Sequence, residues 1–477
     1  MSATEHAPQP LYVSRTKVYP RRVKGTIRRI KWAVLIVCLA VYYLVPWLRW
    51  DRGPGHPDQA VLIDMAGHRA YFFGIEIWPQ EIYYITGLLI LAAVGLFFVT
   101  SMFGRLWCGY ACPQTVWTDL FMWTERLIEG DRTARMRLDQ QAMTLGKLTR
   151  KATKHTVWLL IGAATGGAWI MYFNDAPTVV GQIVHLEADT TVWFFFGLFT
   201  ATTYLLAGWA REQVCTYMCP WPRFQASMVD EETLTVTYRT WRGEQRGSHK
   251  KGESWEGRGD CVDCRACVAV CPTGIDIRDG LQLECIGCGL CIDACDEIMD
   301  RVERPRGLIA FDTYNNQLAR QRGEQASYRF LRPRTFVYSA ILLLAASAML
   351  FKLATRATIE VGVLPDRSPL FVTLSDGSIR NGYTLHISNM NPHDETFWVR
   401  VTGLPDAMLG MAGSEPQQIA AEQGMPVSVK SDSVGTFRVY LHAPRSAVNV
   451  EAPLDFIVRA AGGEVAAHAS NFRGPAR

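Results

Sequence analysis

The chain has 477 residues, of which 49% are hydrophobic and 20% are charged, and its formal net charge is +4. This length exceeds that of one ordinary domain, and so low a share of charge, together with 15 Trp, argues against a wholly soluble enzyme. The Lys and Arg residues gather beside apolar runs, which indicates membrane topology rather than a nucleic-acid partner.

Five segments are apolar enough to span a bilayer, which requires about 20 residues. In chain order they are Lys31–Leu48, Ile82–Phe103, His155–Phe173, Thr191–Ala210 and Thr335–Leu353. Trp and Tyr flank the first two, as expected for amphipathic rings at a membrane–water interface. The sequence therefore predicts a multi-pass membrane protein with about five transmembrane helices.

The distribution of Lys and Arg predicts the orientation of these spans. Nine basic residues lie in 104–154, whereas 174–190 contains none. Eight precede the first span, namely Arg15, Lys17, Arg21, Arg22, Lys24, Arg28, Arg29 and Lys31. The positive-inside rule therefore places the N-terminus, 104–154 and 211–334 in the cytoplasm and the C-terminus outside, which in a Gram-negative cell is the periplasm.

The C-terminal tail, residues 357–477, has the pattern of a β domain. Short alternating stretches are separated by turn-prone sequences such as Ser375-Asp376-Gly377. The stretches are Tyr383–Ser388, Thr396–Thr402, Pro426–Val429, Thr436–Leu441 and Leu454–Val458. Strands at this spacing predict a small sandwich of immunoglobulin-like size, with a docking or stabilising role.

The cysteines are concentrated in the first two thirds of the chain. Twelve of the 13 fall into three groups, Cys38 stands alone in an apolar run, and none follows Cys295. A disulfide-stabilised exported protein would distribute cysteines through its soluble domains, so this pattern indicates metal ligation in a reducing compartment.

The strongest motif is a doubled four-cysteine run within about 255–303. Three thiolates at x2 spacing wrap one cubane cluster, and the fourth cysteine binds the other cluster. This predicts one [4Fe–4S] cluster on Cys261, Cys264, Cys267 and Cys295, and a second on Cys285, Cys288, Cys291 and Cys271. Zinc is the alternative, but zinc sites use separated CxxC pairs and seldom a doubled run.

Two further motifs follow the second and fourth spans, as Cys108-Gly-Tyr-Ala-Cys112-Pro113 and Cys215-Thr-Tyr-Met-Cys219-Pro220. Their matching positions suggest an internal duplication of a two-helix unit. Cysteines at i and i+4 share a helix face, so four thiolates at one depth could bind Cu(I), cycle between dithiol and disulfide, or hold another metal. Simple packing of small thiols at a helix end is the alternative.

The order of these features resembles the FixG/CcoG/RdxA family, accessory proteins of cbb3-type cytochrome c oxidase. The resemblance rests on Tyr19-Pro20-Arg21-Arg22, on Trp78-Pro79-Gln80-Glu81, on both CxxxCP motifs, on the double ferredoxin signature and on the β tail. It spans nearly the whole chain. NapH-like proteins also carry paired CxxxCP motifs.

The resemblance implies reduction of Cu(II) to Cu(I) for insertion into the oxidase, with two [4Fe–4S] clusters as cofactors and copper as substrate. It also implies that the eight cluster cysteines bind iron and that Cys108, Cys112, Cys215 and Cys219 form a membrane-proximal redox or copper site. The expected partners are the lipid bilayer, oxidase assembly factors, a copper transporter or chaperone, and an unidentified electron donor. Two alternatives remain open: an electron-transfer subunit of a quinol dehydrogenase, as in NapH, and a redox-sensing assembly scaffold.

The expected organisation is therefore a multi-domain protein of a bacterial inner membrane. Its parts are a basic cytoplasmic segment (1–30), a four-helix membrane region (31–210), a cytoplasmic iron–sulfur region (211–333), a fifth span (334–354) and a periplasmic immunoglobulin-like domain (357–477).

Overall fold

The computed structural model describes residues 17–53, 56–250, 252–391, 393–412, 419–431, 433–447 and 450–475. Arg15, one of the basic residues counted before the first span, lies outside the described residues. The chain forms two compact units, Met1–Met349 and Leu350–Arg477.

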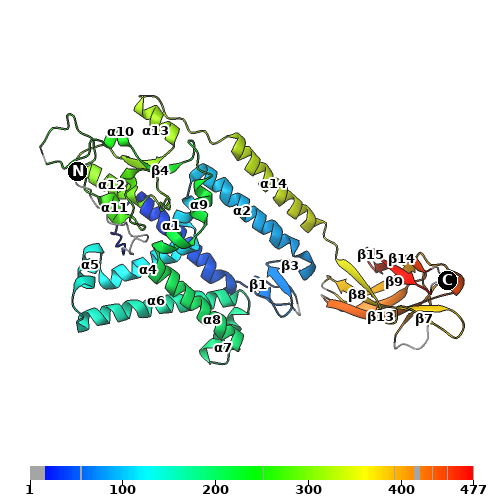
Figure 1. The fold of residues 1–477 in the computed structure, drawn as a ribbon. Coiled ribbons are helices and arrows are strands. Elements are labelled where there is room, and N and C mark those ends of the chain that lie inside the picture. The colour runs from blue at the N-terminus through cyan, green and yellow to red at the C-terminus, as the bar shows by residue number, and fades with distance from the viewer. Residues whose placement is uncertain are drawn as a thin grey trace, which may run out of the picture. The chain divides into compact units, whose positions relative to one another are not determined.

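Long helices form the framework of the first unit (Figure 1). They are α1 (Thr26–Leu44), α2 (Tyr83–Phe103), α6 (Leu145–Met171), α8 (Thr190–Thr203), which continues as a π-helix over Tyr204–Ala210, and α14 (Pro333–Ala354). Shorter helices connect them, namely α3 (Leu106–Tyr110), α4 (Pro113–Glu129), α5 (Arg132–Gln140), α7 (Ala176–Val184) and α9 (Trp221–Ala226).

Four helical segments in the described part of the chain are long and apolar enough to cross a membrane. They are Thr26–Trp47, Pro79–Phe103, Thr190–Ala210 and Pro333–Ala354, and they correspond to four of the five predicted spans. The remaining predicted span lies in α6, where only the 17 residues 155–171 follow Lys154. That length is at the lower end of the range of about 17–25 residues for a spanning helix.

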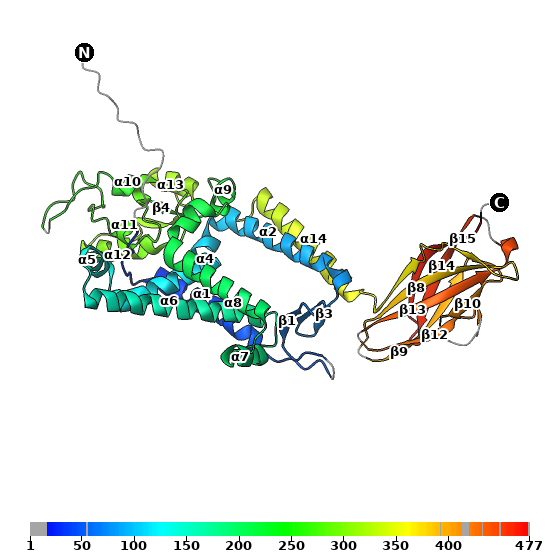
Figure 2. The same ribbon diagram turned by 60° about the horizontal axis from the view of Figure 1, so that its bottom comes forward.

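Helix α6 is nevertheless packed closely against α8, and the two lie side by side in both ribbon views (Figure 2). A Cβ atom added at Gly162 would lie 3.1 Å from the Thr200 carbonyl oxygen, and one at Gly166 would lie 3.0 Å from that of Phe196. Small residues spaced four apart let helix backbones approach, which is the usual packing device inside a bilayer.

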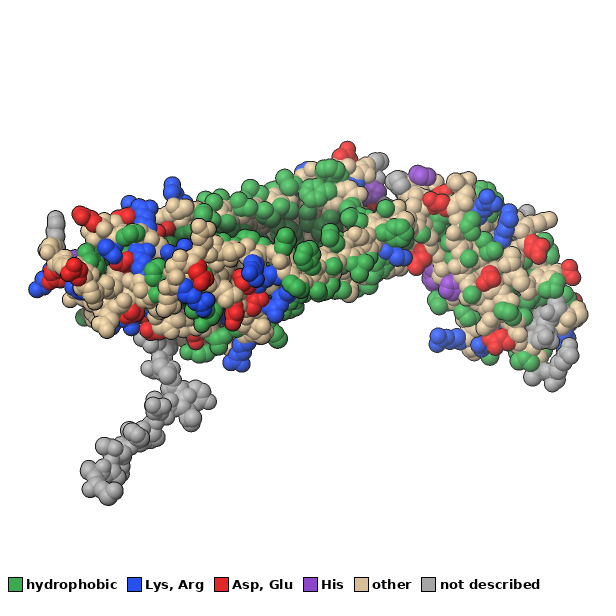
Figure 3. Space-filling view, turned by 90° about the horizontal axis from the view of Figure 1, so that it is seen from above, with side chains coloured by type: hydrophobic (Ala, Val, Ile, Leu, Met, Phe, Trp, Pro, Cys, Tyr) green, Lys and Arg blue, Asp and Glu red, His purple; other side chains and the backbone are tan. Residues whose placement is uncertain are grey.

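The surface of the first unit is consistent with helices that cross a membrane. Figure 3 shows hydrophobic side chains gathered over the helices and charged side chains gathered over the cysteine-rich part. Exposed apolar side chains include Ile36 and Val37 of α1, Leu88 and Leu89 of α2, and Leu343 and Leu344 of α14. A small antiparallel sheet, β1 (Val61–Asp64), β2 (Arg69–Phe72) and β3 (Ile75–Ile77), lies between α1 and α2 in the chain.

The cysteine-rich part is framed by an antiparallel strand pair, β4 (Thr235–Tyr238) and β5 (Ile309–Asp312). Between them lie α11 (Ala266–Val270) and α12 (Leu290–Arg301). Their core consists of Val236, Met299, Leu308 and Ile309 together with cysteines. The start of α1 is anchored here, because Asp293 of α12 accepts hydrogen bonds from the backbone N–H groups of Ile27 and Arg28.

The second unit is a sandwich of two antiparallel sheets. One sheet has the order β11-β10-β13-β8-β6, with β7 paired to β8, and the other has the order β12-β9-β14-β15. The strands are β6 (Ile359–Pro365), β7 (Val372–Thr373), β8 (Ile379–Asn389), β9 (Glu395–Thr402), β10 (Met408–Met411), β11 (Ile419–Ala420), β12 (Met425–Val429), β13 (Ser433–Ala443), β14 (Glu451–Ala460) and β15 (Val465–Arg473).

Each predicted strand lies within an observed one, β8, β9, β12, β13 or β14. The core lies between the sheets and includes Tyr383, Phe397, Phe456 and Phe472, all fully buried. The predicted immunoglobulin-like fold is confirmed. Strand β15 was missed because its run Val465-Ala-Ala-His-Ala-Ser carries few large apolar residues.

Candidate functional site

The eight cysteines of the doubled motif line two cavities. Cys261, Cys264, Cys267 and Cys295 line one, and Cys271, Cys285, Cys288 and Cys291 line the other. These are the two sets of four that the motif spacing predicts, and they are named here set 1 and set 2. Cys267 also borders the second cavity, so the two sets are neighbours.

The two halves of the motif have the same backbone shape. In the first, Asp263 and Arg265 both have φ of 52°, and at the equivalent positions of the second, Gly287 and Gly289 have φ of 68° and 70°. Left-handed residues that alternate with right-handed ones turn successive N–H groups inward, and such concavities are common at iron–sulfur sites. Asp263 is held in this conformation by an ion pair with Arg278.

The protonation of these thiols depends on what they bind. Burial raises the pKa of Cys267 to about 11 and that of Cys285 to about 12, and it raises the pKa of Cys291 well above its usual value. Without a compensating cation these three thiols are therefore neutral at pH 7. Iron would supply that positive charge, and its binding would release protons.

The arrangement fits a polynuclear cluster better than one metal ion. Among the described residues, no three His, Cys, Asp or Glu side chains are grouped so that they could hold a single ion. A zinc site draws its ligands to one point at about 2.3 Å, whereas the thiolates of a cubane bind different irons. Two neighbouring cavities lined by two sets of four cysteines fit two [4Fe–4S] clusters.

The two CxxxCP motifs also fold alike. Cys108 lies in α3 and Cys112 follows it immediately before α4, which begins at Pro113. Cys215 lies in a π-helical turn, Val214–Met218, and Cys219 follows it before α9. Proline is favoured in the first turn of a helix, where its missing N–H is not needed.

Each preceding helix ends on a left-handed residue four positions before the first cysteine. These residues are Gly104, with φ of 58°, and Arg211, with φ of 45°. Arg211 is not a glycine, and ion pairing with the buried Glu125, at 2.9 Å, holds it in place. The duplication suggested by the sequence therefore extends to the backbone.

The four CxxxCP cysteines lie together, and this group is named here the thiol quartet. Burial, together with the neighbouring thiols of Cys112, Cys108 and Cys219, raises the pKa of Cys215 to about 12. Burial and Cys112 likewise raise the pKa of Cys108 to about 11. Its Sγ donates to Oε1 of Gln225 at 3.0 Å.

The thiol quartet is docked on set 2. Tyr110 donates its hydroxyl to the Cys288 carbonyl at 3.1 Å, and Arg105 donates to the Cys285 carbonyl at 2.9 Å. A Cβ atom at Gly109 would lie 3.0 Å from the Cys288 backbone nitrogen, so glycine is required for this approach. Cys108 and Cys215 pack against the core cluster that contains Cys288. The cysteines therefore follow the order set 1, set 2, thiol quartet.

Sequence reasoning missed Gly109, Tyr110 and Gln225 as parts of this site. Gly109, between Cys108 and Tyr110, was the available signal, because a glycine beside a ligand-type residue often marks a close backbone approach. Gln225 carried no such signal, since only the tertiary fold brings it to Cys108.

Comparison with known proteins is consistent with this geometry. Family models described as "4Fe-4S binding domain" and "4Fe-4S dicluster domain" match residues 85–130 and 210–314, and one described as "IG-like fold at C-terminal of FixG" matches 349–475. The first of these covers Cys108 and Cys112, and the second covers the other ten clustered cysteines.

Two curated relatives match nearly the whole chain. "Nitrogen fixation protein FixG" of Rhizobium meliloti is 49% identical over 464 residues, which cover 91% of this chain and 88% of the relative. "Protein RdxA" of Cereibacter sphaeroides is 49% identical over 476 residues, covering 98% of this chain and 99% of the relative. "Ferredoxin-type protein NapH" of Haemophilus influenzae is 22% identical over 221 residues, or 44% of this chain and 66% of that protein.

Proposed function

This chain belongs to the FixG/RdxA family of membrane iron–sulfur proteins, and on that premise we propose that it reduces Cu(II) to Cu(I) during assembly of a cbb3-type cytochrome c oxidase. In this proposal the bilayer is the bacterial inner membrane, and sets 1 and 2 bind one [4Fe–4S] cluster each on its cytoplasmic side. The sandwich of the second unit is periplasmic.

The observation that carries the proposal is the contact between the thiol quartet and set 2. Tyr110 and Arg105 bind the carbonyls of Cys288 and Cys285, so protein atoms connect the quartet directly to the backbone of set 2. When bound, the clusters supply one-electron transfer, with potentials that span about −700 to +450 mV across proteins. Set 1 then faces the electron donor and the quartet faces the acceptor.

The chemistry of the quartet suits copper as a transient substrate. Thiolates are soft ligands that prefer Cu(I) to harder ions. Each Cu(II) takes up one electron, which the reduced iron–sulfur sets lose and an external donor restores.

A single-turnover experiment tests the proposal. Full-length protein with its clusters loaded is reduced under anaerobic conditions, freed of reductant and mixed with Cu(II) and a Cu(I)-specific chelator. We expect Cu(I) to form in step with the return of visible cluster absorbance. The variants Cys108→Ser and Cys215→Ser should reduce Cu(II) at least tenfold more slowly and retain their iron content.

Cys38→Ser is the matched control, because Cys38 lies in α1 outside both sets and the quartet. Cu(I) formation without oxidation of the clusters would mean that the thiols themselves supply the electrons as a dithiol couple, and it would overturn the relay. Equal rates for Cys108→Ser and Cys38→Ser would remove the quartet from the path.

Quinol oxidation is the second candidate, and the match to NapH over 44% of the chain favours it. This function requires that a quinol reduce the oxidised clusters of the full-length, cluster-loaded protein. Quinol-dependent bleaching of the clusters, with no Cu(I) formed by the reduced protein, would favour this function over copper reduction.

A further inference from the structure

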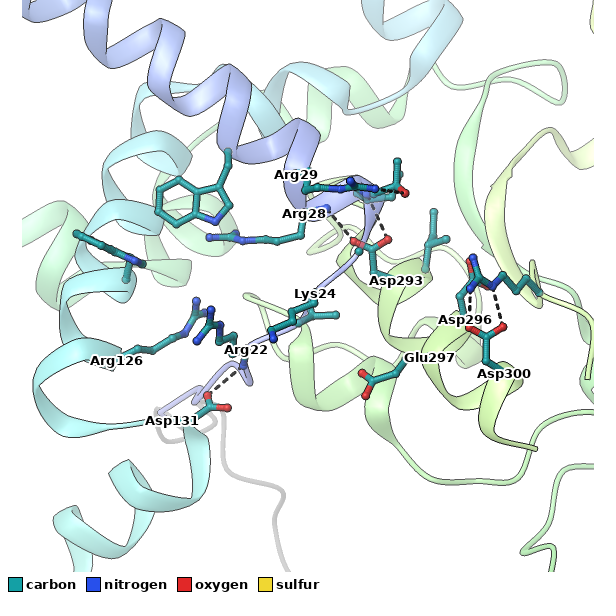
Figure 4. Close-up of a pocket in the computed structure, with 18 of the residues that line it drawn as sticks. Arg22, Lys24, Arg28, Arg29, Arg126, Asp131, Asp293, Asp296, Glu297 and Asp300 are labelled. Carbon is teal, nitrogen blue, oxygen red and sulfur yellow. Dashed lines mark hydrogen bonds and ion pairs between the residues drawn. The ribbon is translucent and has the colours of Figure 1, made fainter. Parts of the chain in front are cut away.

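A large cavity of the first unit takes no part in the proposed electron path. It has a volume of about 1040 Å³ and lies between the segment before α1, helix α4 and helix α12 (Figure 4). Arg22, Lys24, Arg126, Trp32 and Trp123 are among its lining residues, and no described cysteine is. Its size is that of a site for a sizeable small molecule.

The carboxylates of this cavity already have donors. Asp293 accepts from two backbone N–H groups of α1, and Asp300 pairs with Arg306 at 2.6 Å. Asp131 accepts from the Arg22 backbone, Asp296 accepts from the Gly307 backbone, and Glu297 pairs with Arg301. Each of these carboxylates thus has a hydrogen-bond donor within the protein, and Asp300 and Glu297 have a cation partner as well.

Three cations of this cavity, unlike its carboxylates, have no hydrogen-bond partner for their charged groups among the described residues. Within the described part of the chain, no acceptor binds the guanidinium of Arg22 or Arg126 or the ammonium of Lys24. Figure 4 shows the Arg22 and Arg126 side chains directed toward each other. An anion that enters a cavity lined by cations without acceptors can take charge-assisted hydrogen bonds from them.

Arg126 carries the strongest part of this argument. Its Nε atom is buried and has no hydrogen-bond partner among the described residues. Two carboxylates lie near it: Asp119 is already bound by Arg28 at 2.7 Å and by Lys31 at 3.6 Å, and Asp131 accepts from the Arg22 backbone. Burial lowers the pKa of Arg126 to about 10, so it still carries its charge at neutral pH.

The apolar side of the cavity indicates where the anion comes from. Trp32 of α1 and Trp123 of α4 meet edge to face with centroids 6.0 Å apart, and Leu127 beside them is 66% exposed. Helix α1 is a candidate span and continues with the exposed side chains of Ile36, Val37 and Val41. Tryptophan at the end of a span lies at the level of lipid headgroups, and basic pockets beside spans bind anionic lipids.

We propose that this cavity binds the phosphodiester group of an anionic phospholipid through Arg22, Lys24 and Arg126, with the acyl chains lying along the exposed face of α1. A soluble phosphate offers the same chemistry, but it would leave the exposed apolar side chains without a partner. The bound lipid would hold α1 to α12, the helix that carries Cys295. This inference does not depend on the acceptor of the electrons.

Native mass spectrometry of the full-length, cluster-loaded protein in detergent tests the inference. The protein is titrated with phosphatidylglycerol, with phosphatidylcholine and with inorganic phosphate. We expect phosphatidylglycerol to bind most tightly. Each cation removed should weaken that binding about fivefold, so Arg22→Gln with Arg126→Gln should weaken it about 25-fold.

The matched control is Arg150→Gln, because Arg150 is an exposed cation near the start of α6 outside the cavity. Lys24→Gln is a second variant whose exposed side chain can be replaced without disturbing the fold. Equal affinity for the two lipids, or equal losses in Arg150→Gln and the double variant, would overturn the inference. Binding of inorganic phosphate without lipid selectivity would show that the bound anion is a soluble phosphate and not a lipid headgroup.

Discussion

At the scale of single residues, one buried carboxylate joins three parts of the first unit. Glu125 of α4 is 1% exposed and pairs with Arg135 of α5 at 2.9 Å, with Arg211 at 2.9 Å and with Lys154 of α6 at 3.6 Å. Arg211 is also the left-handed residue that precedes the second CxxxCP motif. The shape of the thiol quartet therefore depends on Glu125, which lies outside every motif.

We expect Glu125→Gln to destabilise the first unit by about 3–5 kcal/mol, because it leaves buried cations without their counter-charge. Burial acts to raise the pKa of Glu125, but Arg211, Arg135 and Lys154 together lower it from 4.5 to about 2. A carboxylate with a lowered pKa stabilises the fold fully above pH 4.5 and loses this contribution as the pH falls through about 2.

Chemical unfolding in detergent micelles as a function of pH measures this effect. Between pH 4.5 and 2 the wild-type protein should lose stability more steeply than the Glu125→Gln variant, which has no carboxylate to protonate at this position. Parallel slopes for the two proteins would contradict the assigned role of Glu125.

At the scale of elements, close backbone approaches set the positions of the helices. Gly166 of α6 lies where a Cβ atom would be 2.9 Å from Thr200 Oγ1 and 3.0 Å from the Phe196 carbonyl oxygen. Gly197 of α8 has no atom within 4 Å of an added Cβ, so it faces away from this contact. Glycine is thus required at Gly166, inside the α6–α8 contact, and is not required at Gly197, outside it.

Replacement of each glycine by valine tests whether it lies inside the α6–α8 contact. Gly166→Val should destabilise the first unit by about 1–3 kcal/mol, because extra atoms in a packed contact force the helices apart. Gly197→Val should change stability by less than about 0.5 kcal/mol. Thermal unfolding in detergent compares the two variants, and equal losses would show that the α6–α8 contact is not close in the folded protein.

At the scale of the whole molecule, the two compact units have separate hydrophobic cores. The core of the sandwich consists of residues between Ile359 and Phe472, and the cores around the cysteines lie within the first unit. Each unit can therefore be altered without removing core residues from the other.

A chain truncated after Arg356 should retain its iron content and its rate of Cu(II) reduction in the purified state, because every cysteine and its core remain. Iron analysis and the single-turnover assay measure both properties. Normal chemistry in vitro combined with failed oxidase assembly in cells would assign the sandwich a docking role, as in the scaffold alternative. Loss of iron on truncation would contradict the independence of the units.

The sequence by itself determined the features that depend on local pattern. Apolar run length predicted four of the long apolar helices, and alternation of apolar residues predicted five strands of the sandwich. Cysteine spacing predicted the two sets of four that line neighbouring cavities. The helices and strands were predicted because hydrophobic periodicity is a property of neighbouring residues. The assignment of the cysteines to two clusters stays a prediction, and it rests on the short reach of a ligand loop.

Only the tertiary structure decided which of these features meet. Asp293 holds the start of α1, Gly109 and Tyr110 rest on the Cys288 loop, and Arg126 faces Arg22 across a cavity. Asp293 and Arg28 are 265 positions apart in the chain, and Tyr110 and Cys288 are 178 apart. No local period encodes such contacts, because they form when packed helices bring distant backbone groups and charges within hydrogen-bonding distance.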